Sequence, residues 1–156
     1  MIKNNKIKEL SRSECLIKIM CFAVMLIYIY IVLNFTLFDR AVGVRRKMLT
    51  PLWEVRSMLE TGNYSFWTMQ IMGNILMMLP LGFMLPILFT KFKSIKYSAG
   101  AGFAFSLFIE LSQYYSGRGL FEADDILHNT LGTVAGCIFY IIVSNLITYK
   151  EIKDKI

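Results

Sequence analysis

The sequence predicts an all-α integral membrane protein built from four transmembrane helices. Hydrophobic residues make up 56% of the 156-residue chain, and its mean hydropathy is +0.53, above the values of an ordinary soluble domain. Four apolar segments each approach the roughly 20 residues that a helix needs to cross a bilayer. Most basic residues lie in short polar runs between these segments. The pattern predicts a single membrane domain covering residues 1–156.

The four predicted spans follow one another with short connections, at residues 16–38, 68–89, 97–115 and 125–147. These runs are too long and too continuously apolar for barrel strands, so helices are the expected form. No small-residue cleavage site closes the uncharged run Ile19–Phe38, which predicts a retained anchor rather than a signal peptide. We expect residues 39–67, between the first two spans, to form a helical or irregular loop.

The distribution of basic residues predicts the orientation of the chain. Ten Lys and Arg residues lie in the two terminal tails and the 91–96 link, and six lie in the 39–67 and 116–124 loops. Because cytoplasmic loops carry the excess of basic residues, both termini are expected in the cytoplasm of a multi-pass cell-membrane protein. The net charge of +6 is explained by this orientation, and no long basic segment predicts nucleic-acid binding.

Three cysteines, an odd number without a CxxC pair, argue against a disulfide framework or a zinc site. We read them as small hydrophobic residues within or beside the apolar runs. From the residues alone, the sequence therefore predicts no metal ligands outside the enzyme alternative considered below.

Three of the predicted spans carry polar and small residues on one helical face. In the last span these residues are Asp125, Asn129, Gly132 and Gly136. In the third span they are Gly102, Ser106, Glu110 and Gln113, and in the second they are Gln70 and Asn74. Spacings of three and four residues place side chains on one side of a helix. Small residues allow close approach of helices in lipid, so these three spans are expected to pack on one another.

The polar side chains of the three spans are predicted at a similar depth. At 1.5 Å per residue, Glu110 lies about 20 Å from the cytoplasmic end of its span and Asn74 about 25 Å from that of its own. Asn129 lies about 6 Å below Asp125 by the same rise. We therefore expect a polar cup at the outer leaflet. Arg118 is the expected counter-charge for Glu110.

Simpler interpretations of the same residues remain open. Asp124 and Asp125 could cap a helix N-terminus, where free N–H groups and the helix dipole favour carboxylates. Glu110 and Gln113 could serve only as helix–helix contacts. His128, the only histidine, is read as an interfacial packing residue.

Two stretches resemble the VanZ-like family of membrane proteins. They are NILMMLPLGFMLP at residues 74–86 and FIELSQYYSGRGLFEADDILHNTLGTVAG at residues 108–136. The residues at family positions are Asn74, Pro80, Gly82, Glu110, Gln113, Arg118, Asp125, Asn129, Gly132 and Gly136. In the first outside loop, Arg45 and Arg46 are present, but Met48 and Leu52 stand where the family has Asn and Phe, and Glu122 stands where Asp is common.

The resemblance implies a context in the cell envelope. The family's namesake is associated with low-level resistance to teicoplanin-type lipoglycopeptides. Membrane lipids, a lipid-linked cell-wall precursor and the lipoglycopeptide itself are the implied partners, and an oligomer is left open.

Three functional hypotheses fit these residues. In the first, the polar cup binds or remodels a lipid-linked headgroup through Asn74, Gln113, Arg118, Asn129, Arg45, Arg46 and Asp124. In the second, an enzyme acts on a polyprenyl or lipid phosphate, with Glu110 and Asp125 as its acid and base. Mg²⁺ held by Glu122, Asp124 and Asp125 belongs only to this alternative. In the third, the polar residues serve assembly alone.

Overall fold

The computed structural model describes residues 2–154, with side chains described at residues 13–43, 46–150 and 152–154. Its elements are α1 (Ile2–Leu33), the π-helical turn η1 (Asn34–Phe38), β1 (Val44–Met48), α2 (Trp53–Thr61), α3 (Tyr64–Leu88), the 3-10 turn η2 (Thr90–Lys93), α4 (Ile95–Ser116), β2 (Arg118–Glu122) and α5 (Ala123–Lys153). Helix accounts for 83% of the structure, so the predicted all-helical class is confirmed in outline.

Three helical segments of the described chain are long and apolar enough to cross a membrane. They are Ser13–Phe38, Tyr64–Leu88 and Ala123–Lys150, and they match the predicted first, second and fourth spans. The predicted third span is present as α4, but it does not reach the same hydropathy. Its buried face carries four polar residues, Ser98, Ser106, Glu110 and Gln113, which lower the mean hydropathy of the segment.

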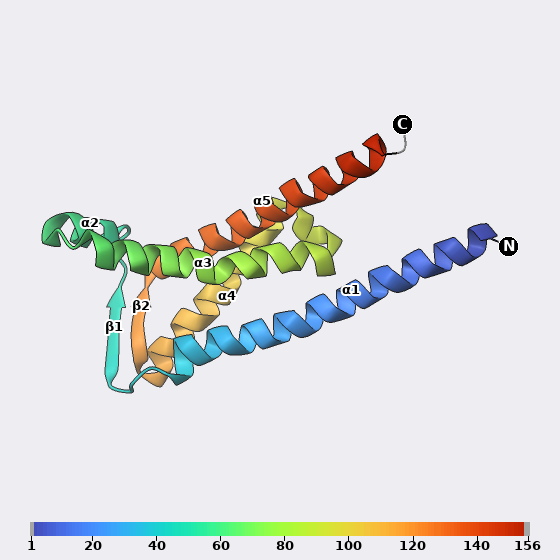
Figure 1. The fold of residues 1–156 in the computed structure, drawn as a ribbon. Helices are drawn as coiled ribbons and strands as arrows, with labels where there is room; N and C mark the ends of the chain where they lie inside the picture. Colours follow the sequence, from blue (N-terminus) through green and yellow to red (C-terminus); the bar gives the residue numbers. More distant parts are fainter. Residues whose placement is uncertain (1, 155–156) are drawn as a thin grey trace.

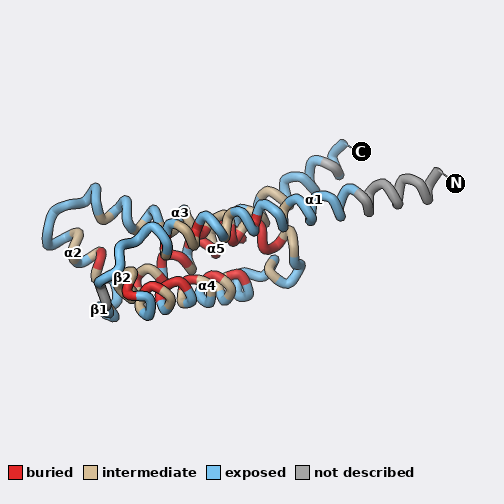
Figure 2. Tube along the Cα trace, turned by 90° about the horizontal axis from the view of Figure 1, so that it is seen from below, coloured by how far each residue is buried: buried red, intermediate tan, exposed pale blue. Residues whose placement is uncertain are grey.

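The central packing of the molecule is formed by α3, α4 and α5. Helix α5 packs most extensively against α3 and then against α4, and the buried positions concentrate along these three helices (Figure 2). Helix α1 runs alongside this group and is largely exposed over residues 13–33, where its side chains are described. It is joined to α3 by a hydrogen bond from the Tyr28 hydroxyl to the Met77 carbonyl, at 2.7 Å. The apolar core around this contact includes Met25, Met78 and Ile109.

Glycines allow α3 and α5 to meet backbone to backbone. A Cβ at Gly132 would overlap the carbonyl of Ile75, and one at Gly136 would overlap the carbonyl of Leu79. From the other side, a Cβ at Gly82 would overlap the Thr133 carbonyl. The structure thus supports the expected close approach of these helices, because no larger residue fits at the contact.

A two-stranded parallel sheet closes the end of the bundle opposite the termini (Figure 1). Its register pairs Val44 with Arg118 and Met48 with Glu122. The expectation of a helical or irregular loop at residues 39–67 is correct for α2 but wrong for β1. Both strands are short, and each pairs with a segment far away in the sequence, so local periodicity does not reveal them. The sheet places α2 beside the beginning of α5.

Candidate functional site

Polar side chains gather where α1 and α4 end and α3 and α5 begin, next to the sheet (Figure 1). The Asn74 amide donates to Oδ1 of Asp125 at 2.6 Å, which joins α3 to α5. The Asn129 amide donates to the Ser106 hydroxyl at 2.8 Å, which joins α5 to α4. The polar faces of the three helices therefore meet inside the bundle, as their spacing predicts.

An open cavity of about 770 Å³ lies at this end of the molecule. Its charged and amide side chains are Arg40, Arg46, Gln70, Asn74, Arg118, Glu122 and Asp125, with Ala41, Gly43, Gly119 and Leu120 completing the described wall. The wall thus combines three guanidinium groups with two amides and two carboxyl groups. Such a set of groups recognises a polar ligand that carries both anionic and hydrogen-bonding atoms.

Arg118, one of the three arginines of the cavity wall, is held by contacts within the fold. Nη1 of Arg118 donates to the carbonyls of Leu37 and Phe38, each at 3.0 Å, so it fixes β2 to the end of α1. The expectation that Arg118 neutralises Glu110 is wrong, because its guanidinium points to these carbonyls. Among the described residues, the cation that acts on Glu110 and Glu122 is Arg40, a residue that the sequence did not single out.

Three residues of the predicted site are buried within the bundle and do not line the cavity. Oε2 of Glu110 accepts a 2.8 Å hydrogen bond from the backbone N–H of Glu122. The Gln113 amide donates to the Thr36 carbonyl at 3.0 Å. Gln113 and Asn129 each keep a buried amide oxygen without a hydrogen-bond partner. Glu110, Gln113 and Asn129 therefore connect elements around the cavity, and the cavity wall itself comes from other predicted residues.

Asp124 binds the beginning of another helix. Its Oδ1 accepts from the Leu52 N–H at 2.6 Å, and its Oδ2 accepts from the Glu54 N–H at 3.1 Å. These N–H groups lie at the start of α2, where backbone donors lack partners within the helix. Leu52 adopts a left-handed backbone with φ 58°, a conformation unusual for leucine. Asp124 is therefore a capping residue, but it caps α2 rather than its own helix.

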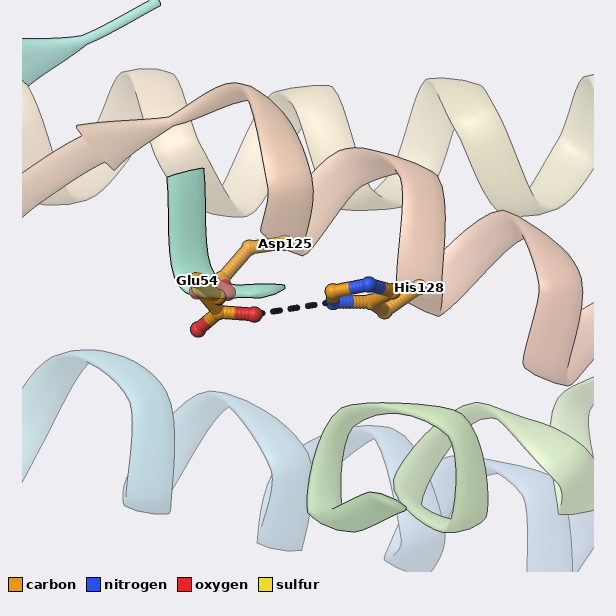
Figure 3. Close-up of side chains that lie close together, drawn as sticks. All are labelled: Glu54, Asp125 and His128. Atoms are coloured by element: carbon orange, nitrogen blue, oxygen red, sulfur yellow. Dashed lines mark ion pairs between the residues drawn. The ribbon is translucent and has the colours of Figure 1, made fainter. Parts of the chain in front are cut away.

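Glu54 and His128 form a buried pair that the sequence did not predict. Glu54 from α2 is 1% exposed and His128 from α5 is 4% exposed. Oε2 of Glu54 and Nδ1 of His128 lie 3.1 Å apart, yet neither atom has an aligned hydrogen-bond partner. The interpretation of His128 as a packing residue did not anticipate this partner: the ring is buried and faces Glu54 (Figure 3).

Two carboxyl groups at this end have strongly raised pKa values. Burial, with the nearby carboxylates of Asp125, Glu122 and Asp124, raises the pKa of Glu54 to about 7. Burial and Asp125 raise the pKa of Glu122 to about 7 as well, although Arg40 acts in the opposite direction. Both groups therefore change their charge near neutral pH.

The segment between α1 and α3 contributes side chains to the cavity wall, including Arg40 and the predicted binding residue Arg46. The side chain of Arg45 lies outside the part of the chain that the structure describes. Met48 belongs to β1, opposite Glu122, and Leu52 donates its N–H to Asp124. Because this donor is a backbone group, the departure from the family's residue at position 52 leaves the contact intact.

A family model described as VanZ/LLP1 matches residues 17–144 of the chain. The matched range contains α3, α4, both strands, most of α5 and every residue of the cavity wall. No curated protein and no solved structure matches the chain.

Proposed function

The chain belongs to the VanZ/LLP1 family, and we propose that it is a multi-pass cell-membrane protein whose polar cavity binds the anionic headgroup of a lipid-linked envelope precursor. The observation that carries the proposal is the cavity itself, with Arg40, Arg46 and Arg118 lining a volume of about 770 Å³. This volume lies within the range of small-molecule sites, roughly 300–1,000 Å³.

In this proposal α4 is a fourth crossing helix. Its 22 residues extend about 33 Å at 1.5 Å per residue, enough for the hydrocarbon core. Large apolar side chains on its outer surface, Phe103, Phe108 and Tyr115, are 51%, 55% and 71% exposed. Lipid is the natural environment for this surface, while the polar face of the same helix packs inward.

In the orientation proposed for the bundle, the cavity lies at the outer surface. The start of α1 and the end of α5 lie at the end opposite the sheet (Figure 1). Ten basic residues lie in the segments at that end and six in the loops at the cavity end, which favours cytoplasmic termini. A headgroup in the outer leaflet would then meet the cavity directly.

The residues of the wall suit a phosphate joined to a sugar or an amide. Guanidinium groups form charge-assisted hydrogen bonds to phosphate oxygens. Gln70 and Asn74 add amide groups for hydroxyl or peptide atoms, and Glu122 and Asp125 add acceptors. A precursor headgroup held in the cavity would be less accessible to teicoplanin-type lipoglycopeptides. We propose lowered susceptibility of the cell to these antibiotics as the physiological consequence.

Binding is favoured over the carboxylate-dependent enzyme by the position of the two acids. Asp125 lines the cavity, but Glu110 does not and instead accepts from the Glu122 backbone. An acid and a base must both reach the reacting group. These two residues do not share the cavity wall, so the acid–base pair suggested by the sequence has no common substrate position.

Substitution of Arg40 tests the proposal. Arg40→Gln is expected to weaken binding of a polyprenyl diphospho-sugar about tenfold, because a charge-assisted hydrogen bond contributes about 1.5–3 kcal/mol. Binding is measured with purified protein in nanodiscs containing increasing amounts of this lipid. Arg40 is preferred to Arg118, whose bonds to the end of α1 also hold the fold together.

Arg56→Gln is the matched control, because Arg56 lies on α2, is largely exposed and pairs with Glu60. It should bind the lipid like the unchanged protein. Cells that express Arg56→Gln should have the same teicoplanin susceptibility as cells that express the unchanged protein. Equal lipid binding by the Arg40→Gln and unchanged proteins would contradict the assignment of the cavity as the headgroup site.

A further inference from the structure

Three potential metal ligands from two helices converge beside the cavity. They are Glu54 of α2 and Asp125 and His128 of α5, and one ligand atom from each lies within 4.8 Å of the others. Figure 3 shows the Glu54 carboxylate facing the edge of the His128 ring, with Asp125 next to Glu54. Asp125 and His128 are three residues apart on one helix, and this spacing places both on the side that meets α2.

The contact between Glu54 and His128 lacks the geometry of a simple ion pair. Nδ1 and Oε2 are 3.1 Å apart, but no aligned hydrogen bond joins them, although both side chains are more than nine-tenths buried. A metal ion binds imidazole nitrogen and carboxylate oxygen at about 2.0–2.2 Å. An ion at that distance from both atoms lies off the line between them. The nitrogen's lone pair then points at the ion and away from the oxygen, which matches the observed misalignment.

The charge around Glu54 also favours a cation. Among the described residues, the charged groups that act on it are Asp125, Glu122 and Asp124, all of them acids. Arg40 acts on Glu122 and Asp125 but is not among the groups that act on Glu54. A buried carboxylate without a compensating charge is costly by several kcal/mol. A divalent ion at the cluster would supply the missing positive charge.

Neighbouring residues hold two of the three ligands in place. Asp124 accepts hydrogen bonds from the N–H groups of Leu52 and Glu54, so it fixes the start of α2 and the position of Glu54. The Asn74 amide donates to Oδ1 of Asp125 at 2.6 Å. Hydrogen bonds of this kind orient the ligating groups of metal sites and raise their affinity.

We propose that Glu54, Asp125 and His128 bind one divalent transition-metal ion of the class that includes zinc and manganese. An imidazole nitrogen favours such ions over Mg²⁺ and Ca²⁺, and two carboxylates suit zinc and manganese better than thiolate-preferring ions. Because Asp125 also lines the cavity, the proposed metal site adjoins that space. The site is independent of the proposed lipid ligand, since it is defined by the metal alone.

Metal binding by the purified full-length chain tests the site. The protein is prepared in detergent with a histidine-free tag, stripped with a chelator and titrated with Zn²⁺ by calorimetry and with Mn²⁺ by electron paramagnetic resonance. The unchanged protein is expected to bind one ion per chain. Glu54→Gln and His128→Gln are each expected to lower the affinity by at least about tenfold.

Glu60→Gln is the matched control, because Glu60 lies on the same helix as Glu54 but has a largely exposed side chain. It should bind metal like the unchanged protein. Co²⁺ absorption separates the proposed nitrogen and oxygen ligands from the thiolates of Cys15, Cys21 and Cys137. If a variant does not give folded protein, the Co²⁺ spectrum of the unchanged protein still identifies the kind of ligand at the site.

The proposal is overturned if the unchanged chain binds neither Zn²⁺ nor Mn²⁺ stoichiometrically, or if folded Glu54→Gln and His128→Gln proteins bind as tightly as it does. A Co²⁺ spectrum dominated by thiolate charge transfer overturns it too, as does binding of Mg²⁺ or Ca²⁺ alone. Loss of lipid binding with metal binding retained would reject the headgroup proposal and leave the metal site standing.

Discussion

The first two turns of α5 and its middle section differ in how they contact the rest of the chain. The middle section meets α3 through Gly132 and Gly136, where backbone lies against backbone. The first turns carry Asp124, Asp125 and His128, whose partners come from α2 and α3. The glycine contact provides only close packing of the two helices, whereas the polar contact leaves buried polar atoms without hydrogen-bond partners. We infer that the glycine contact maintains the fold and the polar contact provides the binding chemistry.

Adding methyl groups at the glycine contact should have the largest effect. Gly132→Ala and Gly136→Ala each place a Cβ on a carbonyl of α3, and overpacking of this kind costs about 1–3 kcal/mol or more per site. The double variant is expected to give no monodisperse folded protein. Size-exclusion chromatography in detergent and the thermal midpoint measure this outcome.

Gly73→Ala provides the comparison, because it lies on α3 and a Cβ there has no neighbour within 4 Å. Its stability should be unchanged or raised by up to about 1 kcal/mol through the better helix propensity of alanine. A folded double variant with an unchanged thermal midpoint would show that α3 and α5 do not depend on this contact.

Removal of the Asp124 carboxylate should have the next largest effect. Asp124→Ala leaves the N–H groups of Leu52 and Glu54 without their acceptor, and the expected loss is about 3 kcal/mol. Helix α2 should detach while the helices of the bundle remain folded. Faster proteolysis within residues 49–63, with retained helical circular dichroism, would report this local release.

Glu54→Gln changes a side chain at the same junction of α2 and α5 but leaves the hydrogen bonds of Asp124 in place. The Oε2 atom of Glu54 has no hydrogen-bond partner, and its uncompensated charge is lost in the amide. The free energy of unfolding of the Glu54→Gln protein should therefore differ from that of the unchanged protein by less than about 1 kcal/mol. If both substitutions destabilised α2 equally, the distinction between a capping acid and a ligand acid would be wrong.

The contrast between the two sections of α5 also explains which features the sequence predicts. The three- and four-residue spacing from Asn129 through Gly132 to Gly136 is a property of one helix, so it indicates a packing face without knowledge of the partner. Asn74 and Asp125 follow the same logic on neighbouring helices, and the structure joins them by a hydrogen bond.

The features that the sequence did not predict arise from the segment between α1 and α3. Glu54 lies on a short helix whose position depends on the pairing of β1 with β2. Arg40 lies in the turn before β1, where no periodicity marks it. His128 has a partner only because α2 is placed against α5, so helical phase within α5 could not reveal its role.

The smallest expected effect concerns the charge of Glu122 in the cavity wall. Burial, and then Asp125, raise the pKa of this carboxyl to about 7. Between about pH 4.5 and pH 7, the folded state therefore binds one more proton at Glu122 than the unfolded state does. The stability that this group contributes is fully present at low pH and is lost as the pH rises through 7. Above pH 7 the wall also gains a negative charge near Arg40.

Binding of an anionic headgroup should accordingly weaken a few-fold between pH 6 and 8, a change on the order of 1 kcal/mol for a charge at this range. A polyprenyl diphospho-sugar is the suitable probe, because both of its phosphates are diesterified and keep a constant charge over this range. Glu122→Gln should flatten the pH profile, and Glu60→Gln, on the exposed face of α2, should keep it. If the Glu122→Gln protein retained the full pH dependence, the titrating group would lie elsewhere, and the carboxyl group of Asp125 in the same wall would be the next to substitute.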